Sequence, residues 1–125
     1  MKIKDVEKRT QMDRATLYYY EKEGLLSPER TENGYRIYSA EDLLMIEKIK
    51  LLRSLQISIE ELKALKREET SLSSVLKTQL NLLSSEEKKS QDAKEICQKM
   101  LAQGETFVTL YPEQYEIRGR HHIPE

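Results

Sequence analysis

Tyrosines are concentrated in one short region of the sequence, close to several cations. Five of the seven tyrosines fall within 21 residues, at Tyr18, Tyr19, Tyr20, Tyr35 and Tyr38, although the chain has one Phe and no Trp. The chain is therefore not generally rich in aromatic rings, and the gathering of rings with hydroxyl tips in one small region requires a specific explanation.

The net charge does not settle whether the partner is a nucleic acid. Residues 1–67 carry 14 Lys+Arg and 12 Asp+Glu, a net charge of +2, and residues 68–125 carry 7 and 10, a net charge of −3. The sign suits a nucleic-acid-binding N-terminal half, but the excess is small. If the chain binds DNA, we expect it to use a few well-placed cations.

Other chemistry has little support in the sequence. The single cysteine, Cys97, is expected to be a buried small hydrophobe, and adjacent His121 and His122 lack the spacing of a metal site. No glycine-rich phosphate loop, paired carboxylates or activated nucleophile is present, so we predict no enzyme activity, metal or cofactor. One cysteine and no secretory or membrane-spanning segment indicate a cytoplasmic protein.

The tyrosine-rich region begins with two short predicted helices. Ile3 and Val6 form the apolar edge of the first, and Asp13 is a good N-cap for the second, which starts at Arg14 and stops at Gly24. A short break between two helices indicates a helix-turn-helix, although a generic helical hairpin would have the same pattern.

A predicted hairpin follows these helices. Asn33-Gly34 is a strong hairpin signal because both residues tolerate positive φ. The alternation after it places Arg36 and Tyr38 on one face and Tyr35 and Ile37 on the other. A hairpin directly after a helix-turn-helix is a wing.

Three further helices are predicted after the wing. Ser39 caps a helix that has Asp42 at its third position, and Ser58 with Glu61 forms a capping box for the next. Residues 70–103 contain no Pro or Gly and are predicted to form one long helix.

The long helix has leucine-rich and Ile96–Met100 ends around a polar middle. We expect it to pair antiparallel with a second copy, with Glu86–Glu87 near the partner's Lys88–Lys89; the alternative is a lone amphipathic helix packed on its own domain. The predicted dimerisation residues are Leu72, Leu76, Leu80, Leu83, Ile96, Cys97 and Met100. Gly104 ends this helix, and residues 104–125 are expected to be an extended tail, interpreted as the start of an absent or truncated effector domain.

Three motifs in order resemble the MerR family of bacterial transcription regulators. They are "TLYYYEKEGLL", the wing "NGYRIYS" and "LLRSLQISIEELKAL". The resemblance implies a mainly α fold, with a winged helix-turn-helix DNA-binding head at residues 1–68 and an antiparallel coiled-coil dimerisation helix at 69–103. It also implies a homodimer that bends and untwists promoter spacer DNA, and so acts indirectly on RNA polymerase, in response to an effector.

The residues expected to meet DNA lie on the second helix and the wing. Leu17 and Tyr20 are assigned to the core of the head, and Tyr20 and Tyr35 are expected to be packing residues. The predicted DNA-binding residues are Arg14, Thr16, Tyr18, Tyr19, Lys22, Arg36 and Tyr38.

Several positions depart from the family pattern. Tyr18 replaces a cation, for which Arg14 one turn earlier can substitute, and Glu7, Gln11 and Gln56 replace small residues or glycines. Glu7 and the missing cation at position 18 keep open a second function, a coiled-coil protein-interaction adaptor that has lost DNA binding. The effector is unknown from sequence. The position of the tail resembles the junction that leads into the multidrug-binding effector domain of some family members, and this resemblance implies a cationic, apolar molecule.

Overall fold

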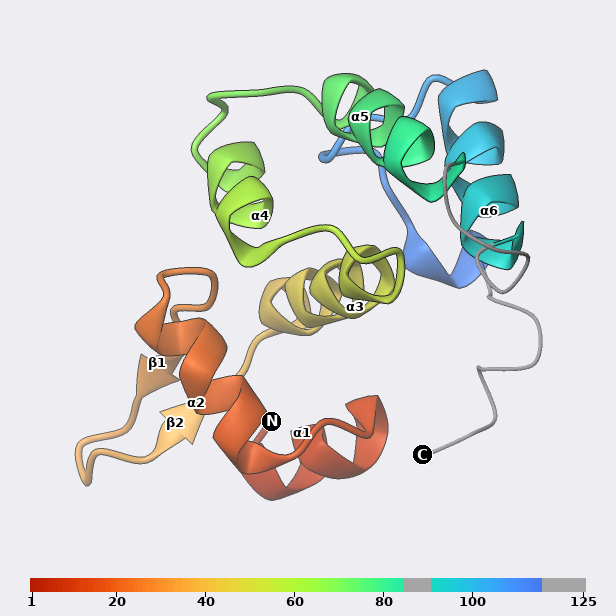
Figure 1. Cartoon of the computed structure of the whole chain (residues 1–125). Coiled ribbons are helices and arrows are strands. Elements are labelled where there is room, and N and C mark those ends of the chain that lie inside the picture. The colour runs from red at the N-terminus through yellow and green to blue at the C-terminus, as the bar shows by residue number, and fades with distance from the viewer. Residues whose placement is uncertain (85–90, 116–125) are drawn as a thin grey trace. The chain divides into compact units, whose positions relative to one another are not determined.

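The computed structural model of the chain describes residues 1–84 and 91–115. These residues form six α-helices, a two-stranded sheet and a short 3₁₀ helix (Figure 1). Backbone packing divides the chain into two compact units, Met1–Ile49 and Lys50 onward, so that the boundary falls inside α3. The fold is mainly α, as the sequence predicts.

The first unit begins with the predicted helix-turn-helix. Helices α1 (Ile3–Thr10) and α2 (Arg14–Lys22) pack on each other, and the side chains of Val6, Leu17 and Tyr20 are buried. Gln11 ends α1 with φ of 60°, a left-handed conformation that glycine adopts more easily. The turn therefore keeps its geometry even though a glutamine occupies it.

The predicted wing is a short antiparallel hairpin. Strand β1 (Glu29–Arg30) pairs with β2 (Arg36–Ile37), and Arg30 lies directly opposite Arg36. The Thr31 N–H donates to the Tyr35 carbonyl (2.8 Å), and the Gly34 N–H donates to the Thr31 carbonyl (2.9 Å). Gly34 has φ of 86°, whereas Asn33 does not adopt positive φ, so the glycine alone uses the expected conformational freedom.

The first residues of the chain extend this hairpin. The Met1 amino group donates to the Tyr38 carbonyl (2.8 Å), and the Tyr38 N–H donates back to the Met1 carbonyl (2.7 Å). Lys2 forms a further antiparallel bridge with Ile37. The wing is therefore fixed by backbone pairing along both edges of β2.

Helices α3 (Ala40–Ser54) and α4 (Ile59–Lys66) begin at the predicted caps. Ser39 and Asp42 exchange side-chain-to-backbone hydrogen bonds of 2.8 and 3.0 Å, and Ser58 and Glu61 form a full capping box. Gln56, between the two helices, has φ of 69°. Gln56, which departs from the glycine of the family pattern, therefore adopts a left-handed conformation.

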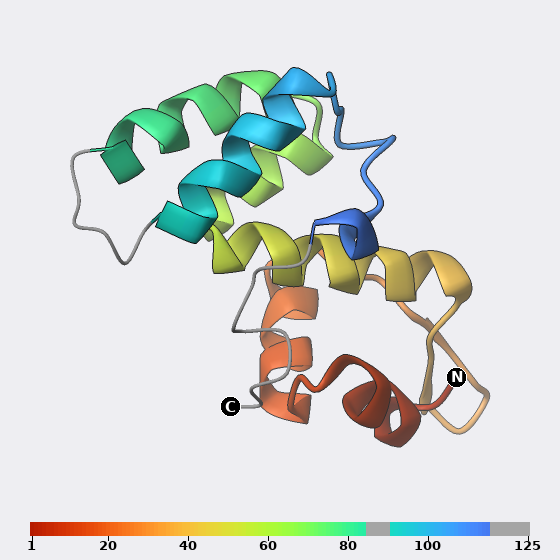
Figure 2. The ribbon, with the colours of Figure 1, turned by 90° about the vertical axis from the view of Figure 1, so that its right-hand side faces the viewer.

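The prediction of one continuous helix over residues 70–103 is wrong. Helices α5 (Leu72–Ser84) and α6 (Gln91–Ala102) are separate, run in opposite directions and pack on each other (Figure 2). The physical reason is that the apolar stripe of each helix covers the other, which differs both from the predicted dimer and from the alternative of one helix packed on its own domain. Six of the seven predicted dimerisation side chains are thereby buried in this one chain, namely Leu72, Leu76, Leu83, Ile96, Cys97 and Met100, and Leu80 is half-buried.

The expected ion pairs of Glu86–Glu87 with Lys88–Lys89 lie outside the described residues. So do His121 and His122. Where the tail is described, it contains no strand: a turn at residues 107–109 lies in an irregular segment, and a 3₁₀ helix follows at Pro112–Gln114. Leu110 and Tyr115 are buried, and the Tyr115 hydroxyl hydrogen-bonds the side-chain oxygens of Gln103 and Glu105. The described part of the tail is therefore anchored by two buried side chains and is not a free extended segment.

Candidate nucleic-acid interface

The start of α2 is fixed by its N-cap. The Asp13 carboxylate accepts a hydrogen bond of 2.8 Å from the Thr16 N–H, and hydrogen bonding to Thr16 lowers the pKa of Asp13. Thr16 itself is half-buried beside this cap. The cap sets the position of the first turn, from which Arg14 and Ala15 project.

The buried face of α2 is the predicted one, because Leu17 and Tyr20 are buried. Arg14, Tyr19 and Lys22 of the predicted outward face are exposed, whereas Tyr18 is half-buried. Tyr19 is 46% exposed, and its ring lies 5.7 Å from that of Tyr20. An exposed helix face with an aromatic ring held against the core is suited to entering a major groove.

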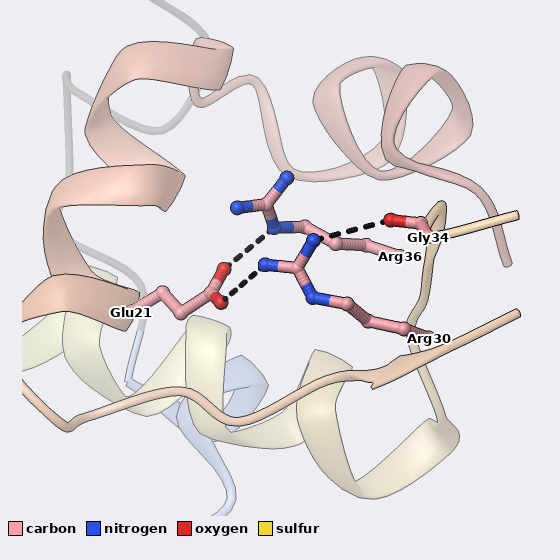
Figure 3. Close-up of polar contacts among 4 residues, drawn as sticks. All are labelled: Glu21, Arg30, Gly34 and Arg36. Carbon is pink, nitrogen blue, oxygen red and sulfur yellow. Dashed lines mark hydrogen bonds and ion pairs between the residues drawn. The ribbon is translucent and has the colours of Figure 1, made fainter.

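A cluster of one carboxylate and two arginines joins α2 to the wing (Figure 3). Glu21 Oε1 accepts from Arg36 Nε at 2.6 Å, and Glu21 Oε2 accepts from Arg30 Nη2 at 3.2 Å. Arg30 Nη1 also donates to the Gly34 carbonyl at 3.1 Å, which ties down the tip of the hairpin. The wing is thus attached to α2 by side chains as well as by the backbone.

Arg36 is held from two directions. Its guanidinium carbon lies 4.0 Å from the centre of the Tyr18 ring, in addition to the Nε hydrogen bond to Glu21. The hydrogen bond to Glu21 raises the pKa of Arg36 further above its ordinary value. A stacked, hydrogen-bonded arginine is ordered before any ligand arrives.

The burial of two tyrosines, Tyr35 and Tyr38, is the reverse of what the sequence predicts. Tyr38, predicted to contact DNA, is 2% exposed, whereas Tyr35, expected to pack, is 69% exposed. The reason is that backbone pairing with Met1 fixes Tyr38 as a continuation of the hairpin whose side chain enters the core of the head. Its hydroxyl has no hydrogen-bond partner in the part of the chain that the structure describes, and burial raises the pKa of Tyr38.

Arg14 is paired within the head. Its Nη2 donates to Glu7 Oε1 at 3.0 Å, across the helix-turn-helix. Glu7, one of the departures from the family pattern, therefore has a partner on the second helix. Because both side chains are partly exposed, the ion pair is weak, and Arg14 can exchange the Glu7 carboxylate for another anion.

Glu21 and Arg30 were not predicted from the sequence. A two-residue turn at Asn33-Gly34 would place Thr31 opposite Arg36, whereas the structure pairs Arg30 with Arg36. A like-charged cross-strand pair is destabilising without a carboxylate between its members, and Glu21 of α2 supplies that carboxylate.

Over residues 1–84 and 91–115, no group of three or more His, Cys, Asp or Glu side chains is placed to hold a metal, and no helix is long and apolar enough to cross a membrane. Cys97 is buried, and burial raises the pKa of its thiol to about 11, which fits a packing role.

A helix-turn-helix with a hairpin attached beside its second helix is the architecture of a winged DNA-binding domain. The model of the MerR HTH family of regulatory proteins matches residues 1–69, more than half of the sequence. The chain belongs to the MerR family, whose members are DNA-binding transcription regulators and not enzymes.

Individual relatives agree with this assignment. The chain is 44% identical over 63 residues to the HTH-type transcriptional regulator AdhR of Bacillus subtilis (strain 168), covering 50% of this chain and 45% of AdhR. It is 38% identical over 65 residues to the HTH-type transcriptional regulator HmrR of Rhizobium leguminosarum bv. viciae, covering 52% and 50%.

A longer match is to the nodulation protein NolA of Bradyrhizobium sp. (strain NC92), 29% identical over 96 residues, covering 76% of this chain and 40% of NolA. The chain thus spans half or less of the length of each of these three relatives. No solved structure matches the chain.

Proposed function

We propose that the chain binds double-stranded promoter DNA through the outward face of α2 and the β1–β2 wing. The observation that carries this proposal is the ordered Arg36, stacked on Tyr18 and attached to the helix that presents Tyr19 and Lys22. α2 would lie in the major groove, and Arg36 would meet the flanking backbone. Of the residues predicted from sequence, Arg14, Thr16, Tyr18, Tyr19, Lys22 and Arg36 are retained, and the buried Tyr38 is withdrawn.

We also propose that the working unit is a homodimer. The α5–α6 hairpin pairs a leucine-rich stripe with the Ile96–Met100 segment, which is the same pairing that an antiparallel dimer would use between two copies. Two copies that exchange α6 would bury the same side chains, so exchange loses little packing energy. A dimer would place two α2 helices on one near-palindromic operator, and bending or untwisting the spacer would follow as indirect readout.

DNA binding is tested by a gel-shift assay at low salt on a fragment that carries the chain's own promoter region. Wild type should shift the fragment, and Arg36→Ala should shift it only at higher protein concentration. If neither protein shifts DNA, the alternative of a protein-interaction adaptor replaces this proposal.

Dimerisation is tested by analytical ultracentrifugation over a range of concentrations. Wild type should sediment as a dimer, and Leu76→Lys, which places a charge at a fully buried position of α5, should not. Lys77→Ala, on the exposed side of the same helix, is the control and should remain dimeric. A monomeric wild type at every concentration would contradict the dimer.

A further inference from the structure

The Glu21 cluster has an unusual distribution of charge for a surface meant to meet DNA. Arg30 and Arg36 lie opposite each other on the hairpin, and each takes one oxygen of the Glu21 carboxylate. Two cations and one anion leave the cluster with a net charge of +1. A carboxylate at this place reduces the attraction for phosphate, so simple electrostatics predicts that removing it should strengthen DNA binding.

The geometry around Arg36 indicates the opposite. Glu21 binds only the Nε of Arg36, and the Tyr18 ring lies against the guanidinium group. The two terminal nitrogens, Nη1 and Nη2, have no partner in the described part of the chain, and Figure 3 shows no contact to them from the other residues drawn. Together they form a fork of donors that matches one phosphate group.

Arg30 adds stiffness. Its second hydrogen bond, to the Gly34 carbonyl, links the same carboxylate to the tip of the hairpin. Glu21 therefore fixes a side chain of β2 and, through Arg30, the loop that joins the strands. Without the carboxylate, the opposed arginines repel each other, and Arg36 loses the hydrogen bond that orients its fork.

We propose that Glu21 is a positioning residue for phosphate, one that orients Arg36 so that Nη1 and Nη2 face a single phosphodiester of the DNA backbone. This inference rests on the proposed function, since it assumes that the wing meets DNA. Glu21 does not touch the ligand; it acts by ordering the arginine that does, so that less freedom is lost on binding.

The sign of one substitution separates positioning from simple repulsion. Glu21→Gln removes a negative charge and keeps the shape of the side chain, and we expect DNA binding about fivefold weaker, which is within the range of one charge-assisted contact. The matched control is Glu29→Gln, which removes an exposed carboxylate from β1 of the same hairpin. It should bind DNA as tightly as wild type or up to about twofold more tightly.

A double-mutant cycle with Arg36 shows whether Glu21 acts through that arginine. In the Arg36→Ala background, Glu21→Gln should no longer weaken binding and should strengthen it slightly, because only its repulsion is left. Arg36→Lys keeps the charge but has neither the Nε donor nor the fork. It should bind more weakly than wild type with an unchanged salt dependence, and adding Glu21→Gln should cause no further loss.

Affinities are measured by fluorescence anisotropy on a labelled promoter duplex, with circular dichroism confirming that each variant is folded. The inference is supported if Glu21→Gln binds DNA more weakly than wild type but causes no further weakening in the Arg36→Ala and Arg36→Lys backgrounds. Binding by Glu21→Gln that equals or exceeds wild type overturns it while the proposed function stands. If wild type itself binds no duplex, the proposed function fails, and the role of Glu21 fails with it. Should Glu21→Gln not fold, the Arg36→Lys result alone decides: affinity equal to wild type overturns the inference.

Discussion

A buried glutamine in the second unit gives a prediction whose magnitude follows from the structure. Gln79, on α5, is 4% exposed, and its Nε2 donates to the Leu55 carbonyl at 2.8 Å. Leu55 is fully buried and follows the end of α3, where Gln56 turns the chain with φ of 69°. The amide of Gln79 thus satisfies a carbonyl that the end of the helix leaves without an intrahelical partner.

Replacement of Gln79 by methionine removes this donor at nearly constant side-chain length. A buried carbonyl left without a partner costs about 1–3 kcal/mol, and the similar shape keeps the cavity contribution small. We therefore expect Gln79→Met to lower the free energy of unfolding by about 2 kcal/mol and Tm by roughly 5–10 °C.

Replacement by glutamate adds a pH dependence. At pH 7, the ionised carboxylate introduced by Gln79→Glu offers no proton to the Leu55 carbonyl and is desolvated, so this variant should be less stable than Gln79→Met. Burial raises the folded-state pKa of that carboxyl above its unfolded value of about 4.3. The protonated acid can donate to Leu55, so the stability deficit should shrink as the pH falls toward 4 and grow as it rises through the folded pKa.

Urea denaturation followed by circular dichroism at pH 7 and pH 4.5 measures these differences. Gln98, on the exposed side of α6, provides the matched controls Gln98→Met and Gln98→Glu, which should each change stability by less than about 0.5 kcal/mol. A Gln79→Glu protein that is as stable as wild type at pH 7, or whose deficit relative to Gln98→Glu is the same at both pH values, would contradict this role of Gln79.

Three other substitutions test separate features. Gln56→Gly should raise the free energy of unfolding by about 0.5–1 kcal/mol, because glycine adopts the left-handed conformation without strain; an unchanged or lower Tm would contradict this. Tyr38→Phe removes a buried hydroxyl that has no hydrogen-bond partner in the described residues. This variant should have a Tm equal to or higher than that of wild type and should bind DNA with unchanged affinity. Weaker DNA binding would restore Tyr38 as a contact residue. Burial raises the pKa of Cys97 from 9.0 to about 11, so the stability that comes from the neutral thiol is intact below pH 9 and is lost as the pH rises toward 11. The Tm of wild type should therefore fall more steeply than the Tm of Cys97→Ala between pH 9 and pH 11. Parallel curves of Tm against pH would argue against this effect.

Much of the first unit follows from local sequence signals. Asp13, Ser39 and Ser58 begin their helices as predicted because a capping side chain satisfies N–H groups a few residues away, which is a local matter. The faces of α2 follow from helical spacing in the same way. Tyr35 and Tyr38 were placed on the wrong sides because their positions depend on pairing with Met1, which is 37 residues from Tyr38 and gives no local signal.

The sequence predicts the helices of the second unit better than it predicts their partners. The apolar stripes of α5 and α6 were recognised, but a stripe does not say whether its partner is in the same chain or in another copy. The absence of Pro and Gly suggested continuity, yet the structure folds the two stripes onto each other. Glu21 was missed for a related reason, because its role appears only when α2 and both strands of the wing are brought together.

The most direct test of the central claim is the salt dependence of duplex binding by wild type, Arg36→Ala and Lys77→Ala. If Arg36 meets a phosphate, Arg36→Ala should bind more weakly than wild type, and the fall of log K with log salt should become shallower by about 1 in slope. Lys77→Ala, which removes an exposed cation of α5, should match wild type in both affinity and slope. Equal affinities and slopes for all three proteins would show that the surface formed by α2 and the wing is not where this chain meets DNA.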